Sequence, residues 1–132
     1  MLLRLLIAAL AIFVTYEAIE LWRRPSHKLT RLDLPELGVR GPAIVQFSTP
    51  FCAPCKVAKP HLVEAADKAD ITYAQIDVQD RPDVGAKYGI RSVPTIVVTD
   101  GAGLVLGKWN RLPANSEIHK AAELARSASR TG

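Results

Sequence analysis

Cysteine is scarce in this sequence, and no segment is repeated or of low complexity. Only two of the 132 residues are cysteine, so no second cysteine pair is available to complete a zinc site of the usual four-ligand kind. The net charge of +4 is modest and is spread along the chain. This charge distribution argues against a nucleic-acid-binding protein.

The bulk composition is typical of a folded protein with one domain. Hydrophobic residues make up 48% of the chain and charged residues 23%, which argues against intrinsic disorder over most of its length. A chain of 132 residues can bury one core but is too short for two domains of usual size. One globular unit with an extension is therefore the simplest organisation.

The first 22 residues are almost entirely apolar, with Arg4, Glu17 and Glu20 as their only charged side chains. As a helix, this segment would be about 33 Å long, enough to cross a hydrocarbon layer of about 30 Å. We expect an uncleaved, single-pass membrane anchor. A cleaved signal peptide is one alternative, although bulky and acidic residues follow the apolar run where a cleavage site needs small ones. A helix packed on the protein's own core is the other.

Basic side chains are concentrated just after the apolar segment. Residues 23–31 contain four Lys and Arg, whereas Arg4 is the only basic side chain within the segment. The positive-inside rule therefore favours a domain on the cytoplasmic face of the membrane. An extracytoplasmic domain is left open, because domains on N-terminal anchors also occur on that side.

The rest of the chain alternates between strand and helix patterns. Strands are expected at residues 43–48, 71–78, 94–100 and 104–109, and helices from the cysteines to about 69, at 82–88, and after a cap at Asn115 or Ser116. Two helices show apolar residues at helical spacing: Ala58, Leu62, Ala65, Ala66 and Ala69 in the first, and Ile118, Ala121, Ala122 and Ala125 in the last.

This order predicts an α/β domain. Strands separated by helices are expected to pair in parallel and the last two strands to form a hairpin, giving a mixed β-sheet flanked by helices. Pro60 should bend its helix rather than end it, because the apolar period resumes beyond it. We expect residues 1–24 to form the transmembrane anchor, 25–42 a linker with a short edge strand at 29–34, 43–128 the domain, with an alternative start near 27, and 129–132 a tail.

Both cysteines occur in the segment PFCAPCK, residues 50–56. Cys52 follows a predicted strand and turn, and a helix begins at or just after it. The sulfur of Cys52 would thus lie near the unsatisfied amides and the positive end of the helix dipole, which lower a thiol pKa and favour the thiolate. Cys55 lies one helical turn further on, close enough to form a disulfide with Cys52 and to resolve a mixed disulfide there. Pro54 suits the first turn of the helix.

Three other interpretations of the cysteine pair remain. A structural disulfide would close so short a loop that it contributes only about 2 kcal/mol, against about 4 to 5 kcal/mol for a loop of about a hundred residues. A metal site would need further ligands from His27, His61 or His119, of which only His61 is near in sequence. The third interpretation is a pair of buried, inert cysteines.

The sequence resembles the thioredoxin family at three places. FCAPCK, residues 51–56, resembles the family's active-site hexapeptide. Pro60 lies five residues after Cys55, where the family has a helix-kinking proline. KYGIRSVPT, residues 87–95, is similar to the segment that ends in the family's cis-proline, which makes Pro94 the equivalent. The resemblance covers about residues 27–128.

The resemblance implies a thioredoxin fold and a dithiol-disulfide exchange enzyme without a bound cofactor or metal. Cys52 and Cys55 would be catalytic. Pro94 would abut the cysteines, and the main chain of Val93 would pair with an extended substrate segment. The substrate-contacting residues are thus expected to be Phe51, Ala53, Pro54, Val93 and Pro94. The implied partners are protein disulfides and an upstream reductase or membrane electron donor, with no nucleic acid.

The sequence departs from the family pattern at three points. Phe51 replaces the usual Trp, which should keep an apolar cover over the site. Gln46 stands where the family has a buried Asp, and Tyr73 where it has that residue's Lys partner. Because Gln46 cannot accept a proton, we expect slower resolution at Cys55 or a shifted potential. The family's first long helix is nearly missing between residues 34 and 41, so the first edge of the sheet should need cover from the linker or a partner.

These observations predict a membrane-anchored, thioredoxin-like protein-disulfide reductase. No histidine lies between the cysteines, which favours a reducing role. The alternative is a redox-inactive binding module that holds a partner at the membrane with vestigial cysteines, an interpretation that Gln46 favours. An extracytoplasmic reductase that serves cytochrome or oxidative-folding pathways is a third hypothesis, and the topology of the chain decides it.

Overall fold

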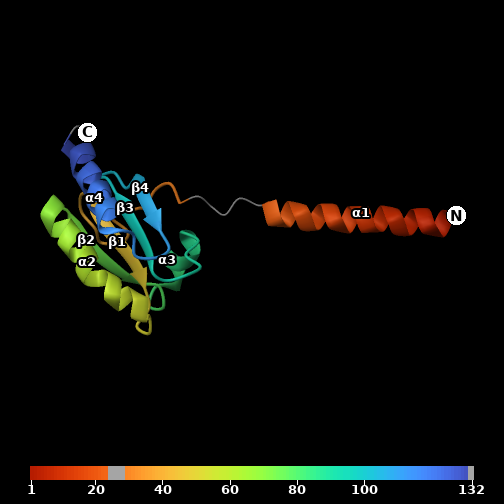
Figure 1. Ribbon diagram of the computed structural model, residues 1–132, viewed down its shortest axis with the longest axis horizontal. Coiled ribbons are helices and arrows are strands. Elements are labelled where there is room, and N and C mark those ends of the chain that lie inside the picture. The colour runs from red at the N-terminus through yellow and green to blue at the C-terminus, as the bar shows by residue number, and fades with distance from the viewer. Residues whose placement is uncertain (24–28, 131–132) are drawn as a thin grey trace.

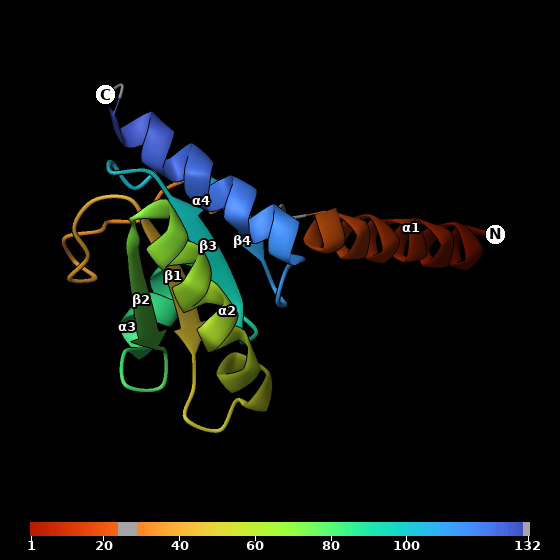
Figure 2. The same ribbon diagram turned by 60° about the vertical axis from the view of Figure 1, so that its left-hand side comes forward.

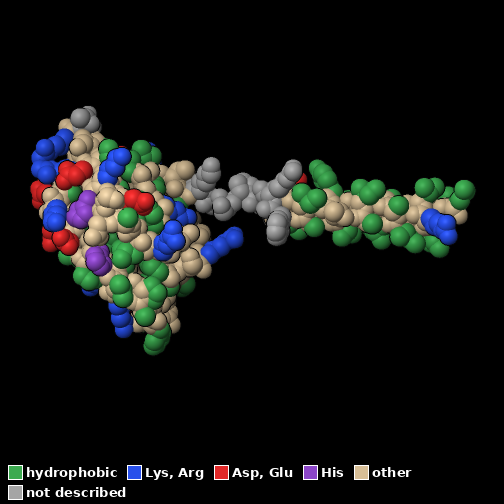
Figure 3. All heavy atoms as spheres, viewed as in Figure 1, with side chains coloured by type: hydrophobic (Ala, Val, Ile, Leu, Met, Phe, Trp, Pro, Cys, Tyr) green, Lys and Arg blue, Asp and Glu red, His purple; other side chains and the backbone are tan. Residues whose placement is uncertain are grey.

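The computed structural model describes residues 1–23 and 29–130. The N-terminal segment forms one helix, α1 (Leu2–Arg23), whose stretch from Leu2 to Leu21 is long and apolar enough to cross a membrane by length and composition. None of that stretch is buried against the rest of the protein, and hydrophobic side chains follow its length in Figure 3. The alternative in which this helix packs on the protein's own core is therefore wrong.

A four-stranded mixed sheet forms the centre of the domain. Its strands, in spatial order, are β2 (Thr72–Asp77), β1 (Ala43–Ser48), β3 (Thr95–Thr99) and β4 (Val105–Trp109). β1 and β2 are parallel, whereas β3 is antiparallel to both β1 and β4. The expected parallel pairing of helix-separated strands thus fails for β3. The helix before it, α3 (Pro82–Lys87), has only six residues, about 9 Å, which is too short to carry the chain back along a strand.

Helices cover both faces of this sheet. Figures 1 and 2 show α2 (Ala53–Ala69) and α4 (Asn115–Arg130) together on one face and α3 on the other. The buried residues of α2 and α4 include every apolar position predicted for their inner faces. β1 is buried along its whole length, because Ile44 packs towards α2 and α4 while Val45 and Phe47 pack towards α3.

The segment before β1 contains less regular secondary structure than predicted. The edge strand expected at residues 29–34 is reduced to one isolated bridge between Arg31 and Leu104. The amide of Leu32 donates a hydrogen bond to the carbonyl of Gly103 at 2.8 Å, and a Cβ on Gly103 would lie 2.1 Å from the carbonyl oxygen of Leu32. Only glycine allows that close approach. Four side chains of the segment join the core on the α3 face: Leu32, Leu34, Leu37 and Val39.

Most predicted element boundaries are confirmed to within one or two residues. β1 matches its predicted range, and α2 continues past Pro60 to Ala69 as expected. α4 begins at Asn115, so the predicted caps at Asn115 or Ser116 are wrong by at least one position. The carbonyl of Ala114 accepts the first amide bonds of this helix instead, from Glu117 and Ile118.

Candidate active site

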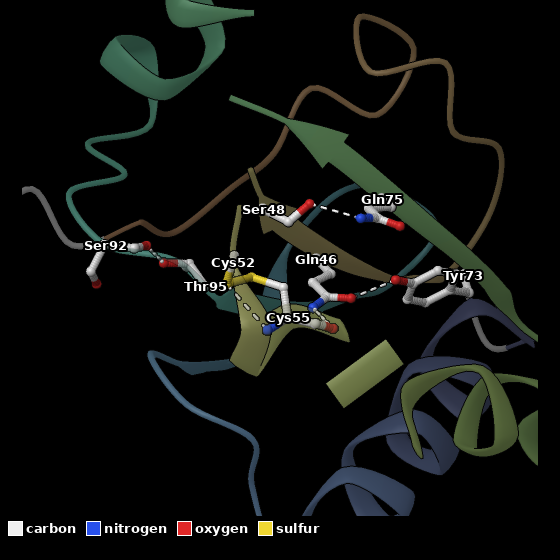
Figure 4. The surroundings of a disulfide bond; sticks show 8 residues. All are labelled: Gln46, Ser48, Cys52, Cys55, Tyr73, Gln75, Ser92 and Thr95. Carbon is white, nitrogen blue, oxygen red and sulfur yellow. Dashed lines mark hydrogen bonds between the residues drawn. A yellow bond between two sulfur atoms is a disulfide. The ribbon is translucent and has the colours of Figure 1, made fainter. Parts of the chain in front are cut away.

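The two cysteines form a disulfide at the start of α2. The Sγ–Sγ distance between Cys52 and Cys55 is 2.09 Å, and their Cα atoms lie 5.2 Å apart. Figure 4 shows the bond at the mouth of the helix, beside the end of β1. The two cysteines that the sequence singled out therefore lie at an ordinary Cα spacing for a disulfide.

Cys52 is the N-cap residue of α2. Its backbone is extended, with φ −92° and ψ 100°, and its Sγ accepts a hydrogen bond from the amide of Cys55 at 3.2 Å. Pro54 lies in the first turn, where the hydrogen that it lacks would have no partner inside the helix. The sulfur of Cys52 thus occupies the position in which serine or aspartate oxygens usually cap helices. An anionic sulfur there gains from both the amide and the helix dipole.

The residues around the disulfide differ strongly in exposure. Cys52 is 7% exposed and Cys55 3%, so Cys52 is the more exposed of two buried residues. Ala53 and Pro54 are exposed. The side chain of Phe51 is 88% exposed. The expectation that it covers the site is therefore wrong, because its ring faces solvent.

The segment that was predicted to contact substrate lies at the same end of the sheet. In the antiparallel register of β1 and β3, Phe47 pairs with Thr95, which brings the chain before β3 next to the turn that carries Cys52. The Val93–Pro94 peptide bond is cis. Val93 is half-buried and Pro94 is buried. Ser92 and Thr95 belong to the immediate surroundings of the disulfide (Figure 4), and the hydroxyl of Thr95 donates to the carbonyl of Ser92 at 2.7 Å.

A chain of polar side chains runs under Cys55. Gln46 is fully buried in β1, and its Nε2 donates to the carbonyl of Cys55 at 3.0 Å. The hydroxyl of Tyr73, on β2, donates to Oε1 of the same amide (Figure 4). The polar atoms of Gln46 are thereby satisfied from both sides. Sequence analysis identified Gln46 and Tyr73 as departures but missed that they bond each other.

The resemblance gave a signal for this pairing, because Gln46 and Tyr73 stand at the positions of a residue and its partner in the family. In the parallel register, Ile44 lies opposite Tyr73, and Gln46 is two residues further along on the same face of β1. A long side chain can cross that diagonal spacing. The register itself, however, could not be read from one sequence.

The polar chain contains no group that ionises near neutral pH. Burial raises the pKa of Tyr73 to about 12, so this phenol stays protonated, and an amide such as that of Gln46 does not titrate. The second polar contact between these strands, from Nε2 of Gln75 to the hydroxyl of Ser48 at 2.9 Å, is also uncharged. No proton acceptor of ordinary strength therefore touches Cys55 among these contacts.

The histidines do not assemble a metal site in the part of the chain that the structure describes, where no group of three or more His, Cys, Asp and Glu side chains lies close enough to hold an ion. His61 is on α2 and His119 on α4. His27, the third candidate, lies outside the described residues.

Comparisons with known proteins agree with this geometry. The family model for thioredoxin matches residues 36–121. A thioredoxin from Mycoplasmoides gallisepticum is 33% identical over 91 residues, which cover 67% of this chain and 91% of that protein. A thioredoxin from Pyropia yezoensis is 37% identical over 59 residues, or 43% of this chain and 55% of the relative.

Coverage is uneven across the relatives. Several further thioredoxins match over 37% to 58% of their length, so the chain spans about half of most of the curated relatives that it matches. Among solved structures, thioredoxin 1 from Thermosipho africanus has a TM-score of 0.57 at 26% identity and covers 67% of this chain and 98% of that structure. The fold of the domain is a thioredoxin fold.

Replacement of Tyr73 by Phe tests the polar chain. The variant leaves Oε1 of Gln46 buried without a donor, which costs about 1 to 3 kcal/mol. We expect denaturant unfolding of the full chain in detergent to show a loss of this size. A double-mutant cycle with Gln46→Met isolates the pair, because the second substitution should then cost much less in the Tyr73→Phe background than alone.

The stability difference between the wild type and Tyr73→Phe should depend on pH. Because the pKa of Tyr73 is raised from 10.0 to about 12, its neutral form is favoured by folding, so its contribution to stability is fully present below pH 10 and is lost as the pH rises through about 12. The stability difference between the wild type and Tyr73→Phe should shrink over this range. Simple additivity in the cycle, together with a constant difference up to pH 12, would contradict the contact.

Proposed function

The chain belongs to the thioredoxin family, and from this we propose that it is a thiol-disulfide oxidoreductase that reduces or exchanges disulfides in protein substrates through Cys52 and Cys55. One observation carries the proposal: Cys52 caps α2 with its sulfur, which accepts the amide hydrogen of Cys55 at 3.2 Å. A structural disulfide has no need of that position, whereas a nucleophilic thiolate gains from it.

The proposed reaction begins with the dithiol form. The thiolate of Cys52 attacks one sulfur of a substrate disulfide, the substrate S–S bond breaks, and its other sulfur leaves as a thiolate that takes up a proton. Cys55, once deprotonated, attacks the sulfur of Cys52 in the mixed disulfide and expels the second substrate sulfur. The product is the Cys52–Cys55 disulfide present in the structure. Two electrons have passed to the substrate, and an external dithiol, from an upstream reductase or a membrane donor, must return them.

The resolving step is the slow one in this proposal. Cys55 must lose a proton before it attacks, and its polar neighbours Gln46 and Tyr73 offer no acceptor of ordinary strength. Water or another neighbouring group must therefore take the proton. The bond from Gln46 to the carbonyl of Cys55 instead fixes the backbone, which keeps the two sulfurs within reach of each other.

Substrate contact is proposed for the residues that surround the pair. Phe51, Ala53 and Pro54 present an exposed, mainly apolar rim. Val93 and Pro94 lie at the same end of the sheet, where a substrate segment could pair with the main chain of Val93. Such pairing would hold the target sulfur in line with Cys52.

We further propose that α1 anchors the protein in a membrane as a single pass, with residues 1–24 as anchor and 129–132 as tail. Of the two proposed starts of the domain, residue 43 and near residue 27, the burial of Leu32, Leu34, Leu37 and Val39 in the core favours the earlier one. The basic side chains that follow α1 in the sequence favour the cytoplasmic face for the domain, by the positive-inside rule.

Turnover of a protein disulfide tests the activity. The full-length chain in neutral detergent should reduce insulin with dithiothreitol as electron source, and Cys52→Ser should lower the rate to background because the nucleophile is lost. Cys55→Ser should retain the first attack and accumulate a mixed disulfide with the substrate. Electrophoresis without reductant should show this species as a band that disappears when a reductant is added. A wild-type rate equal to that of Cys52→Ser would refute the enzyme and favour the redox-inactive binding module.

Membrane extraction and thiol labelling test the anchor and its orientation. In cells that produce the Cys55→Ser variant, the protein should stay in the membrane after alkaline carbonate washing, because α1 crosses the bilayer. A membrane-impermeant maleimide, applied after mild reduction, should label Cys52 only once the cells are opened. Release by carbonate would overturn the anchor. Labelling of intact cells would place the domain outside and support the extracytoplasmic hypothesis.

A further inference from the structure

A cavity of about 200 Å³ lies beside the Val93–Pro94 segment. Arg91, Ser92 and Thr95 line one side of it, and Lys108 and Asn110 at the end of β4 line the other. Thr95 is buried, and the other four side chains are exposed. Gly89 and Ile90 complete the lining. The cavity thus combines apolar surface with exposed polar and basic side chains, and it adjoins the segment that the proposed function assigns to substrate contact.

The surroundings of this cavity carry charge of one sign. Three segments border the disulfide and the cavity, namely residues 49–60, 89–95 and 108–114, and together they contain five Lys or Arg and no Asp or Glu. Among the described residues, neither Arg91 nor Lys108 takes part in an ion pair. Glu117, the first acidic residue after β4 along the chain, accepts a hydrogen bond from the indole of Trp109 at 3.2 Å.

Two other acidic side chains at this end of the sheet, those of Asp77 and Asp80, lie on its other side. Asp77 and Asp80 belong to the end of β2 and the turn after it, and β2 is the strand furthest from β4 in the order β2-β1-β3-β4. The carboxylate of Asp77 is engaged with the amides of Gln79 and Asp80, at 2.8 and 3.3 Å. The disulfide, at the end of the central strand β1, therefore has acidic groups towards β2 and a basic, unneutralised cavity towards β3 and β4.

We propose that this site prefers protein disulfides whose cysteine is flanked by Asp or Glu, and that the cavity between Arg91 and Lys108 receives the acidic side chain. The inference rests on the proposed oxidoreductase function and specifies its substrate class. When a substrate strand pairs with the main chain of Val93, one substrate residue lies opposite Val93. The substrate residue two positions away from it lies alongside Arg91, because residues at a spacing of two share one face of a strand. The exposed hydroxyl of Ser92 adds an uncharged donor for a carboxylate.

The physical effect is one of recognition rather than of chemistry. Basic side chains at the rim raise the local concentration of acidic segments and speed their encounter with Cys52, and salt weakens this attraction. Exposed charge pairs are weak singly, so we expect the combined effect of Arg91 and Lys108 to be about three- to tenfold in the second-order rate.

Matched peptides measure this preference. The full-length chain, reduced beforehand and held in neutral detergent, reacts once with peptides that carry a disulfide-linked fluorescent reporter and differ only in two Glu, two Gln or two Lys beside the cysteine. The Glu peptide should react faster than the Gln peptide, and the Lys peptide slowest. The ratio of Glu to Gln rates should fall towards one as salt rises from about 0.01 M to about 1 M, over which the screening length falls from about 30 Å to about 3 Å.

Variants locate the preference in the cavity. Arg91→Gln with Lys108→Gln should bring the Glu to Gln ratio close to one, and Arg91→Glu with Lys108→Glu should make the Lys peptide the fastest. The matched control, Arg126→Gln with Arg130→Gln, removes the same charge from the far half of α4, at the opposite end of the domain from the cysteines (Figure 2), and should keep the wild-type ratio.

The outcomes separate the two proposals. No reaction with any peptide would refute the oxidoreductase function itself. Reaction with all three peptides at equal rates would leave that function intact and overturn the acidic preference. A preference that persists in the Arg91 and Lys108 variants, or that the control on α4 abolishes, would also overturn the assignment, because it would assign the effect to the overall charge of the chain.

Discussion

The geometry of the site depends on one local contact, the hydrogen bond from the amide of Cys55 to the sulfur of Cys52. It exists because Cys52 stands at the N-cap of α2, after a buried strand and a tight turn, and because proline in the first turn leaves no competing donor. The disulfide, the exposure of Cys52 relative to Cys55 and the approach of the Val93–Pro94 segment all follow from where β1 ends and α2 begins. A sulfur in this position is stabilised as the thiolate relative to the thiol.

Behind that contact lies an uncharged support. The fully buried Gln46 bridges Tyr73 on β2 and the carbonyl of Cys55 on α2, so one side chain joins the sheet to the helix that carries the cysteines. A buried carboxylate at this place would supply a base but would cost free energy to ionise. The amide avoids that cost and offers no base. In this account the protein keeps the nucleophile of its family and gives up some speed in its second step.

Sequence reasoning placed Cys52 and Cys55 correctly at the start of a helix, because the signals for that placement are local. The cysteine spacing, Pro54 and the apolar period of α2 all lie within a few helical turns, and the predicted range of β1 is confirmed. The failures depend on contacts between distant segments. Residues 29–34 form only a bridge to Leu104, Phe51 points into solvent, and β3 runs antiparallel to β1. The bond between Tyr73 and Gln46 required a register that pattern alone does not fix. The basic cavity combines Arg91 and Lys108 from segments whose adjacency only the fold reveals.

The most direct test of the central claim is the pH dependence of alkylation of the reduced protein by iodoacetamide, with the modified cysteine identified by mass spectrometry. If the opening turn of α2 stabilises an anionic sulfur, Cys52 reacts before Cys55, and the midpoint of its rate profile lies well below the value of about 8.5 for a free cysteine. Preferential modification of Cys55, or a midpoint at or above about 8.5, would contradict the account.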